Sequence, residues 1–347
     1  DPFYARANVY CDLGDYDYNL SAVSGINPDD LFLPEHPAVE TAILRQSKPT
    51  RFGDKYADVL REAENIHVWL WTNATHLAID ADGQVTSVQT RTLSGTRRDF
   101  SARAVVLAGG AIENARLLLT SNARNGAAVG NAGGLLGTCY MDHPSGGAGF
   151  LHFDEPMREK AYWSGIKTHA IGDVPIHFTW RLTDDYIEEA GLPNSHYFVI
   201  PLSSDAEVRR QQRAAQNSVG ALKTIAKWSL GREVPETFEL SQEYCRFITN
   251  ADSFAAQTWA DLTGSNRVSR ALLKYESEQR PDRSSFVALD DETDALGLPR
   301  PVLRWEPTRT DIDGIKETVQ HIGRICGETG LARVQLEDHD EDPYWGL

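Results

Sequence analysis

Residues 99–121, DFSARAVVLAGGAIENARLLLTS, place three kinds of local structure in direct succession. Residues 102–107 form a short run of apolar and β-branched residues, which is typical of a strand buried on both faces. Gly109 and Gly110 then allow a tight turn and a close approach of another group to the backbone. From Ala111 the pattern predicts a helix. This order positions nucleotides in doubly wound sheets, and it also occurs as an ordinary crossover in α/β domains.

The predicted helix carries apolar residues on one face and an acidic residue in its first turn. Glu113 near the amino end complements the positive end of the helix dipole. An apolar face of this kind favours packing against the rest of a domain. Its members are Ile112, Ala115, Leu118 and Leu119.

Length, charge and cysteine content exclude several classes of protein. The chain has 347 residues, which is enough for a substantial core and for two domains. Its 50 acidic and 34 basic residues give a formal net charge of -16, which argues against a nucleic-acid partner. The four cysteines are far apart and show no CxxC spacing, so neither a zinc cluster nor a disulfide framework is predicted.

The sequence contains no run of about 18 apolar residues, so we expect no membrane span. Its first residues show neither an initiator Met nor the layout of a secretory signal, so we interpret the start as internal. We expect a cytoplasmic location.

The remaining pattern predicts an α/β part followed by a part rich in antiparallel strands. Strands are predicted over 66–72 and 73–80, with hairpin turns at Asp82-Gly83 and Ser94-Gly95. A glycine-dense loop follows at 121–149, then short β-like runs at 148–203 and a long polar helix at 205–228. Two extended runs are predicted at 269–279 and 285–289, and a helix capped by Asp311 at 311–327.

Local motifs leave two candidate site residues with open alternatives. His143 precedes a proline next to the glycine-dense loop, and it is either a site residue or a histidine bonded to backbone in a turn. In a strand, Tyr275, Ser277 and Gln279 would share one face, opposite Glu276 and Glu278. Such a polar face lines a wet cavity or is simply exposed, and the spacing alone favours exposure.

Several motifs occur together in an order that resembles the glucose-methanol-choline (GMC) family of flavin-dependent oxidoreductases. The similarity is greatest to its bacterial sugar and pyranose oxidase or dehydrogenase branch, and it covers about the whole chain. The motifs are KPTRFG at 48–53, IHVWLWTNATHL at 66–77, AVVLAGGAIENARLLL at 104–119, GLLGTCYMDHP at 134–144 and TDALGLP at 293–299.

The resemblance implies an α/β fold class, with part of a discontinuous, doubly wound FAD-binding domain and a sheet-and-helix (α+β) substrate-binding domain. The corresponding boundaries are 1–147 for the partial FAD-binding domain and 148–310 for the substrate-binding domain. Residues 311–347 would then form a helix and tail that lead back to the FAD-binding and catalytic part.

The resemblance also implies roles for individual residues. Ala74 matches the position where the chain passes the adenine end of FAD, and Ala108 and Gly109 match the turn beside the adenosine and pyrophosphate. Asn114 lies in the helix that follows, His143 in a loop bordering the flavin, and Gln279 on the sheet that faces the substrate. No metal site is predicted.

The implied activity is oxidation of a CH–OH group of a sugar, glycoside or other alcohol, with hydride transfer to the flavin. The family's GxGxxG strand and its segment with the catalytic histidine are not found in this sequence. We therefore expect the catalytic residues outside this chain, in the same polypeptide or in another one, and we expect the chain alone to bind FAD weakly or not at all. The alternative is a non-catalytic carbohydrate-binding or regulatory subunit that retains the fold.

Overall fold

The computed structural model describes residues 2–23, 26, 31, 36–47, 50–126, 129–157, 169–202, 206–230, 239–240, 243 and 268–336, without the side chains of 206–217. Within these residues the chain is a mixed α/β protein in which every strand pair is antiparallel. Two compact units divide the chain. Unit 1 comprises Asp1–Lys48, Ser145–Ser277 and Gly314–Leu347, and unit 2 comprises Pro49–Pro144 and Glu278–Asp313.

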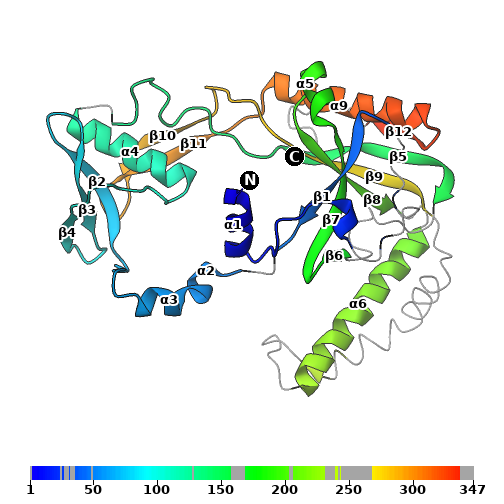
Figure 1. The fold of residues 1–347 in the computed structure, drawn as a ribbon, viewed down its shortest axis with the longest axis horizontal. Helices are drawn as coiled ribbons and strands as arrows, with labels where there is room; N and C mark the ends of the chain where they lie inside the picture. The colour runs from blue at the N-terminus through cyan, green and yellow to red at the C-terminus, as the bar shows by residue number, and fades with distance from the viewer. Residues whose placement is uncertain are drawn as a thin grey trace. The chain divides into compact units, whose positions relative to one another are not determined.

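Unit 1 is built on a seven-stranded antiparallel sheet (Figure 1). Its strand order is β1-β7-β8-β9-β5-β12, and β6 pairs with β7 outside this path. The strands are β1 (Val39–Arg45), β5 (Ser145–Met157), β6 (His169–Ile171), β7 (Val174–Leu182), β8 (Ser195–Leu202), β9 (Val268–Ser277) and β12 (Ala332–Leu336).

The main core of unit 1 lies between one face of this sheet and helix α9 (Arg309–Glu328). Trp180, Tyr197 and Leu273 are among the fully buried side chains that the strands contribute. The helix contributes the apolar residues predicted from its periodicity, and all of them are buried: Ile315, Val319, Ile322 and Ile325. The other helices assigned to this unit are α1 (Pro2–Tyr10), η1 (Leu20–Ala22), α5 (Asp184–Ala190) and α6 (Ala206–Ser229).

A capping box starts α9. The Thr308 Oγ1 accepts a hydrogen bond from the Asp311 amide at 3.1 Å, and the Asp311 carboxylate accepts one from the Thr308 amide at 2.8 Å. Asp311 is therefore the second member of the cap, one turn inside the position predicted for it.

Unit 2 contains two small antiparallel sheets and helix α4 (Ala111–Asn125), which lies beside β2, β10 and β11 in Figure 1. The predicted turns at Asp82-Gly83 and Ser94-Gly95 are confirmed, since they join the three strands of one sheet. The elements are α2 (Phe52–Lys55), α3 (Ala57–Glu62), β2 (Asn73–Ile79), β3 (Val85–Arg91), β4 (Arg97–Phe100), β10 (Phe286–Thr293) and β11 (Pro299–Arg304).

Two strand predictions are wrong. Residues 66–72 and 102–107 join no sheet within the described part of the chain. Val106 is 86% exposed, and Trp71 is 85% exposed with a φ of 59°. An apolar run encodes a preference for burial, but a strand also needs a neighbour to pair with, and no described strand supplies one. The doubly wound parallel sheet therefore stays a prediction.

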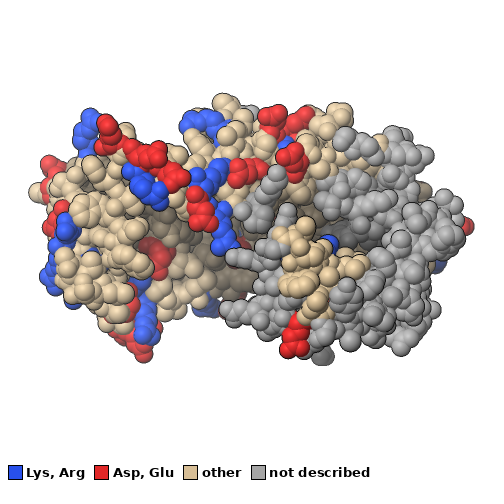
Figure 2. Space-filling model, turned by 90° about the horizontal axis from the view of Figure 1, so that it is seen from below, with Lys and Arg blue, Asp and Glu red and all other residues tan. Residues whose placement is uncertain are grey.

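Charged side chains of both signs are interspersed on the face drawn in Figure 2. No helix in the described ranges is both long and apolar enough to cross a membrane. Lys48 and Pro49 of the first family motif, Asp205 and everything from residue 337 onward lie outside the described residues.

Candidate functional site

The glycine turn before α4 is the first candidate site. Gly110 is the N-cap of α4, with φ 89° and ψ 164°, a conformation that L side chains rarely adopt. A Cβ added there would meet no atom within 4 Å, so the space beside the backbone is open. No side chain in the described residues caps this end of the helix. The first N–H groups of α4 are therefore available to an acceptor on a ligand.

The side chain of Asn114 forms two hydrogen bonds with the backbone of this turn. The Gly109 amide donates to Asn114 Oδ1 at 2.9 Å, and Asn114 Nδ2 donates to the Leu107 carbonyl at 3.1 Å. Both ends of the side-chain amide are thus bonded to the turn. Among the residues predicted to bind the cofactor, the structure brings Gly109 and Asn114 into direct contact, and Asn114 acts by shaping the backbone.

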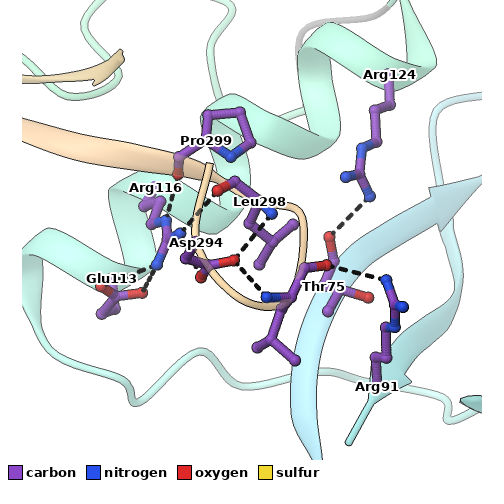
Figure 3. Close-up of polar contacts among 9 residues, drawn as sticks. Thr75, Arg91, Glu113, Arg116, Arg124, Asp294, Leu298 and Pro299 are labelled. Carbon is purple, nitrogen blue, oxygen red and sulfur yellow. Dashed lines mark hydrogen bonds and ion pairs between the residues drawn. The ribbon is translucent and has the colours of Figure 1, made fainter. Parts of the chain in front are cut away.

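Arg116 fastens α4 to the β10–β11 hairpin (Figure 3). Its Nε donates to the Pro299 carbonyl at 2.7 Å, and its Nη2 donates to Asp294 Oδ2 at 2.7 Å and to the Leu298 carbonyl at 3.3 Å. The residue is only 9% exposed. A guanidinium suits this position because it presents several donors in a rigid fork.

Asp294 organises the hairpin turn that receives Arg116. Its Oδ1 accepts hydrogen bonds from the amides of Leu296 at 2.8 Å and Leu298 at 3.0 Å. Burial works to raise the pKa of Asp294, but the hydrogen bonds from Leu298, Arg116 and Leu296 outweigh it, so the pKa is lowered. The partnership of Arg116 and Asp294 was not predicted, although both residues lie in quoted family motifs. The available signal was an aspartate three residues before a glycine, which is typical of a turn.

The buried face of α4 differs from the predicted one. Its fully buried residues are Arg116, Thr120 and Ser121, whereas the predicted apolar residues Ile112, Ala115, Leu118 and Leu119 are only half-buried. The reason is that the neighbouring hairpin and strand present backbone polar groups, which need hydrogen-bonding side chains in the interface.

The backbone of β2 forms such hydrogen bonds with polar side chains of α4. The Leu77 amide donates to Ser121 Oγ at 3.0 Å, and Asn125 Nδ2 donates to the Leu77 carbonyl at 2.9 Å. Arg124 Nη1 donates to the Thr75 carbonyl at 3.3 Å (Figure 3). These bonds connect β2, which carries Ala74, to the last turns of α4, whereas the glycine turn lies at its first turn. Ala74 and the glycine turn therefore do not form a single compact site.

The two remaining residues predicted to lie in the site, His143 and Gln279, are linked through Asp142. Gln279 Oε1 accepts hydrogen bonds from Trp305 Nε1 at 2.7 Å and from the Asp142 amide at 3.4 Å. Gln279 Nε2 donates to the Glu306 carbonyl at 3.2 Å, and the residue is 6% exposed. The adjacent His143 is exposed, and its amide donates to Asp142 Oδ1 at 2.8 Å. Gln279 thus holds the His143 loop in place, and its contact with substrate stays a prediction.

The expectation that Tyr275, Ser277 and Gln279 form an exposed face is wrong. All three are buried, while Glu276 and Glu278 form the more accessible face. The alternation itself is confirmed. Tyr275 and Ser277 lie on the buried face of the sheet, because they pair with Tyr197 and Ser195 of β8, which are also buried.

The opposite face of the unit 1 sheet carries a row of polar residues across four strands. The strand register aligns Glu40 with Arg181 and His196 with Glu276, and Arg181 binds both Glu40 and Asp184. Thr179 Oγ1 lies 3.0 Å from His196 Nδ1. This polar row is a second candidate site, because it places an imidazole among carboxylates and a hydroxyl.

Acid is expected to destabilise unit 1 through His196. Burial lowers its pKa, Arg181 lowers it further, and Glu276 opposes this shift. The unfolded chain then binds the proton more strongly, so the stabilisation is complete above about pH 6.5 and is lost as the pH falls through the folded pKa. Urea midpoints should fall less between pH 7.5 and 5 in His196→Asn than in the wild type. The control is the exposed His143→Asn, and an equal effect of both variants would contradict this origin.

Comparison of the chain with protein-family models gives no match, and comparison with curated proteins gives none either. The described residues contain no group of three or more His, Cys, Asp or Glu side chains that could hold a metal ion. Function is therefore argued from the two candidate sites and the motifs.

Proposed function

We propose that unit 2 binds FAD at the glycine turn, as part of an FAD-dependent oxidoreductase that oxidises a CH–OH group of a sugar, glycoside or other alcohol. The observation that carries this proposal is the open backbone of Gly110 at the amino end of a 15-residue helix. Backbone N–H groups at such an end bind the oxygens of nucleotides. Asn114 holds the backbone of the turn, and Arg116 holds the helix that follows it against the β10–β11 hairpin.

The chain's residues fit the adenosine diphosphate part of FAD. Gly110, which follows Ala108 and Gly109, has no atom within 4 Å of the place of a Cβ, so a ribose or a phosphate can approach its backbone closely. Ala74 lies on a strand held at the other end of α4, and only an extended ligand would contact both places. When bound, FAD supplies the acceptor for the hydride that leaves the substrate carbon. The residues described here bind and orient the cofactor.

The polar row of unit 1 supports the substrate part of the proposal. His196 and Glu276 offer donors and acceptors to hydroxyl groups, and the buried Thr179 lies 3.0 Å from His196. Phe198 lies on the same face, with Lys274 5.7 Å from its ring centroid. Convergent polar groups beside aromatic rings are typical of sites for small polar ligands. The same row also supports the second candidate, a carbohydrate-binding subunit without catalysis. Sugar binding in the absence of any FAD binding would favour that second function.

The test is a titration of the 347-residue chain with FAD and with ADP, followed by flavin fluorescence and calorimetry. We expect weak, saturable binding of both. Gly110→Val should weaken ADP binding about tenfold, because the side chain fills the open space and strains the backbone. Gly83→Val is the matched control, since Gly83 also has a positive φ and open space but lies in the β2–β3 turn. Equal affinities in both variants would contradict the proposed site.

A further inference from the structure

Arg270 lies on the face of the unit 1 sheet that carries the polar row. Its strand, β9, runs between β8 and β5 (Figure 1). The next residue, Ala271, belongs to the core on the α9 side, so the alternation of the strand places Arg270 on the opposite face. The strand register sets Leu202 of β8 and His152 of β5 directly beside it, on the same face. Arg270 is half-buried there.

The guanidinium of Arg270 contacts an aromatic ring and no anion. Its Cζ lies 3.7 Å from the ring centroid of Phe150, which is a van der Waals contact with the ring. Its Nε is buried and has no hydrogen-bond partner, and within the described part of the chain Arg270 forms no ion pair. A buried charged donor without an acceptor costs free energy, so this position favours an acceptor from outside the chain.

The other arginines of this sheet have acceptors. Arg45 donates to two backbone carbonyls, Arg181 pairs with Glu40 and Asp184, and Arg333 lies 3.6 Å from Asp154. The Nε2 of His152, beside Arg270, is 2.9 Å from Gln335 Oε1. The chain has 50 acidic residues against 34 basic ones, so carboxylates are not scarce. Arg270 therefore differs from its neighbours in having its charge uncompensated among the described residues.

We propose that Arg270 forms a binding site for a carboxylate ligand with an apolar body. Contact of the guanidinium with Phe150 leaves the N–H groups at its edge for the two oxygens of a carboxylate. Phe150, Leu202 and Leu272 share its sheet face and are half-buried, so apolar surface borders the charge. Glu276 of the polar row is about 20 Å away along the extended strand, so the two sites are distinct.

The first test needs no ligand. Arg270→Met keeps an unbranched side chain against Phe150 but removes the uncompensated charge. Its urea midpoint should equal or exceed that of the wild type. Arg181→Met is the contrasting variant, since it breaks the pairs with Glu40 and Asp184, and it should lower the midpoint. A midpoint of Arg270→Met as low as that of Arg181→Met would show that the guanidinium already has a stabilising partner, and would overturn the proposal.

The second test uses benzoate as the probe and benzamide as its uncharged counterpart, at constant ionic strength. In the full chain labelled with ¹⁵N-arginine, the Nε–H signal of Arg270 is assigned by its loss in Arg270→Met. This signal should shift saturably with benzoate and stay in place with benzamide, because only benzoate offers a charged acceptor. Arg270→Met should weaken benzoate binding at least about tenfold in calorimetry.

Lys274→Met is the matched control for binding. Lys274 lies on the same face of β9, with its Nζ 5.7 Å from the ring centroid of Phe198, but it is also 3.2 Å from the Glu276 carboxylate. We expect its replacement to change benzoate affinity less than twofold. An equal loss in both variants would indicate attraction by the net charge of this face. That result, equal binding of benzamide, or no saturation with benzoate would each overturn the proposal.

The inference is independent of the proposed binding of FAD. Arg270 belongs to unit 1, whereas the glycine turn belongs to unit 2. Failure of the wild-type chain to bind FAD or ADP would therefore remove the proposed function and leave the carboxylate site in place, and failure to bind benzoate would do the reverse.

Discussion

Replacing Gly149 with alanine is expected to lower the free energy of unfolding of unit 1 by about 3 to 5 kcal/mol. Gly149 has a φ of 138°, and an added Cβ would lie 2.3 Å from the Gln335 carbonyl oxygen and 3.2 Å from Leu336 Cα. These are backbone atoms of β12, which pairs with β5 at this point, so no side chain can rotate out of the way. β12 would have to separate from β5.

Gly147→Ala is the matched control for this prediction. It lies two residues away in the same strand, and its Cβ would meet only the flexible Leu272 side chain, at 3.5 Å. We expect a change in stability below about 1 kcal/mol there. Urea unfolding of both variants, followed by circular dichroism and tryptophan fluorescence, makes the comparison. Similar midpoints for the two variants would contradict the close approach of β5 and β12.

Replacing Asp294 with alanine is expected to cost about 3 to 4 kcal/mol in unit 2. The carboxylate accepts hydrogen bonds from two amides of its own turn and from Arg116. Its removal takes away the nearer counter-charge of the buried guanidinium and leaves only the exposed Glu113, at 3.3 Å. Asp294→Asn should cost less, because its side-chain carbonyl can still accept the amides of Leu296 and Leu298. Thermal and urea unfolding measure this series.

Glu292→Ala is the control in the same hairpin. Glu292 pairs with Arg300 at 2.8 Å, but both side chains are more than half exposed, so we expect a loss of at most about 1 kcal/mol. The lowered pKa of Asp294 adds a dependence on pH. Its stabilisation is complete above the unfolded pKa of about 3.9 and disappears as the pH falls through the folded value. A loss in Glu292→Ala as large as that in Asp294→Ala would contradict the role of burial.

Elements whose signals are local were predicted well from the sequence. The helices α4 and α9 and the β2–β3 hairpin are present where their periodicity and turn residues place them. These signals are local, because one face of a helix is set by residues three and four positions apart and a tight hairpin turn by two central residues. The alternation of β9 was equally clear, but which of its faces is buried was not.

Elements that depend on distant partners were not predicted. The apolar runs at 66–72 and 102–107 have the composition of buried strands, yet they pair with no described strand. The bonds of the Gln279 amide to Asp142, Trp305 and Glu306 were not predicted, and its contact with substrate stays a prediction. The residue type alone does not show whether a polar side chain is hydrogen-bonded within its domain or is free to bind a ligand.

The glycine turn depends both on a local sequence signal and on contacts that only the tertiary structure makes. The sequence by itself determined that a helix starts directly after Gly110, because glycine adopts the φ of 89° found there without the strain that another residue would incur. The tertiary structure decided what surrounds that turn. Arg116 meets Asp294 across 178 positions of sequence, and no local pattern encodes such a contact. That contact fixes the guanidinium between α4 and the β10–β11 hairpin.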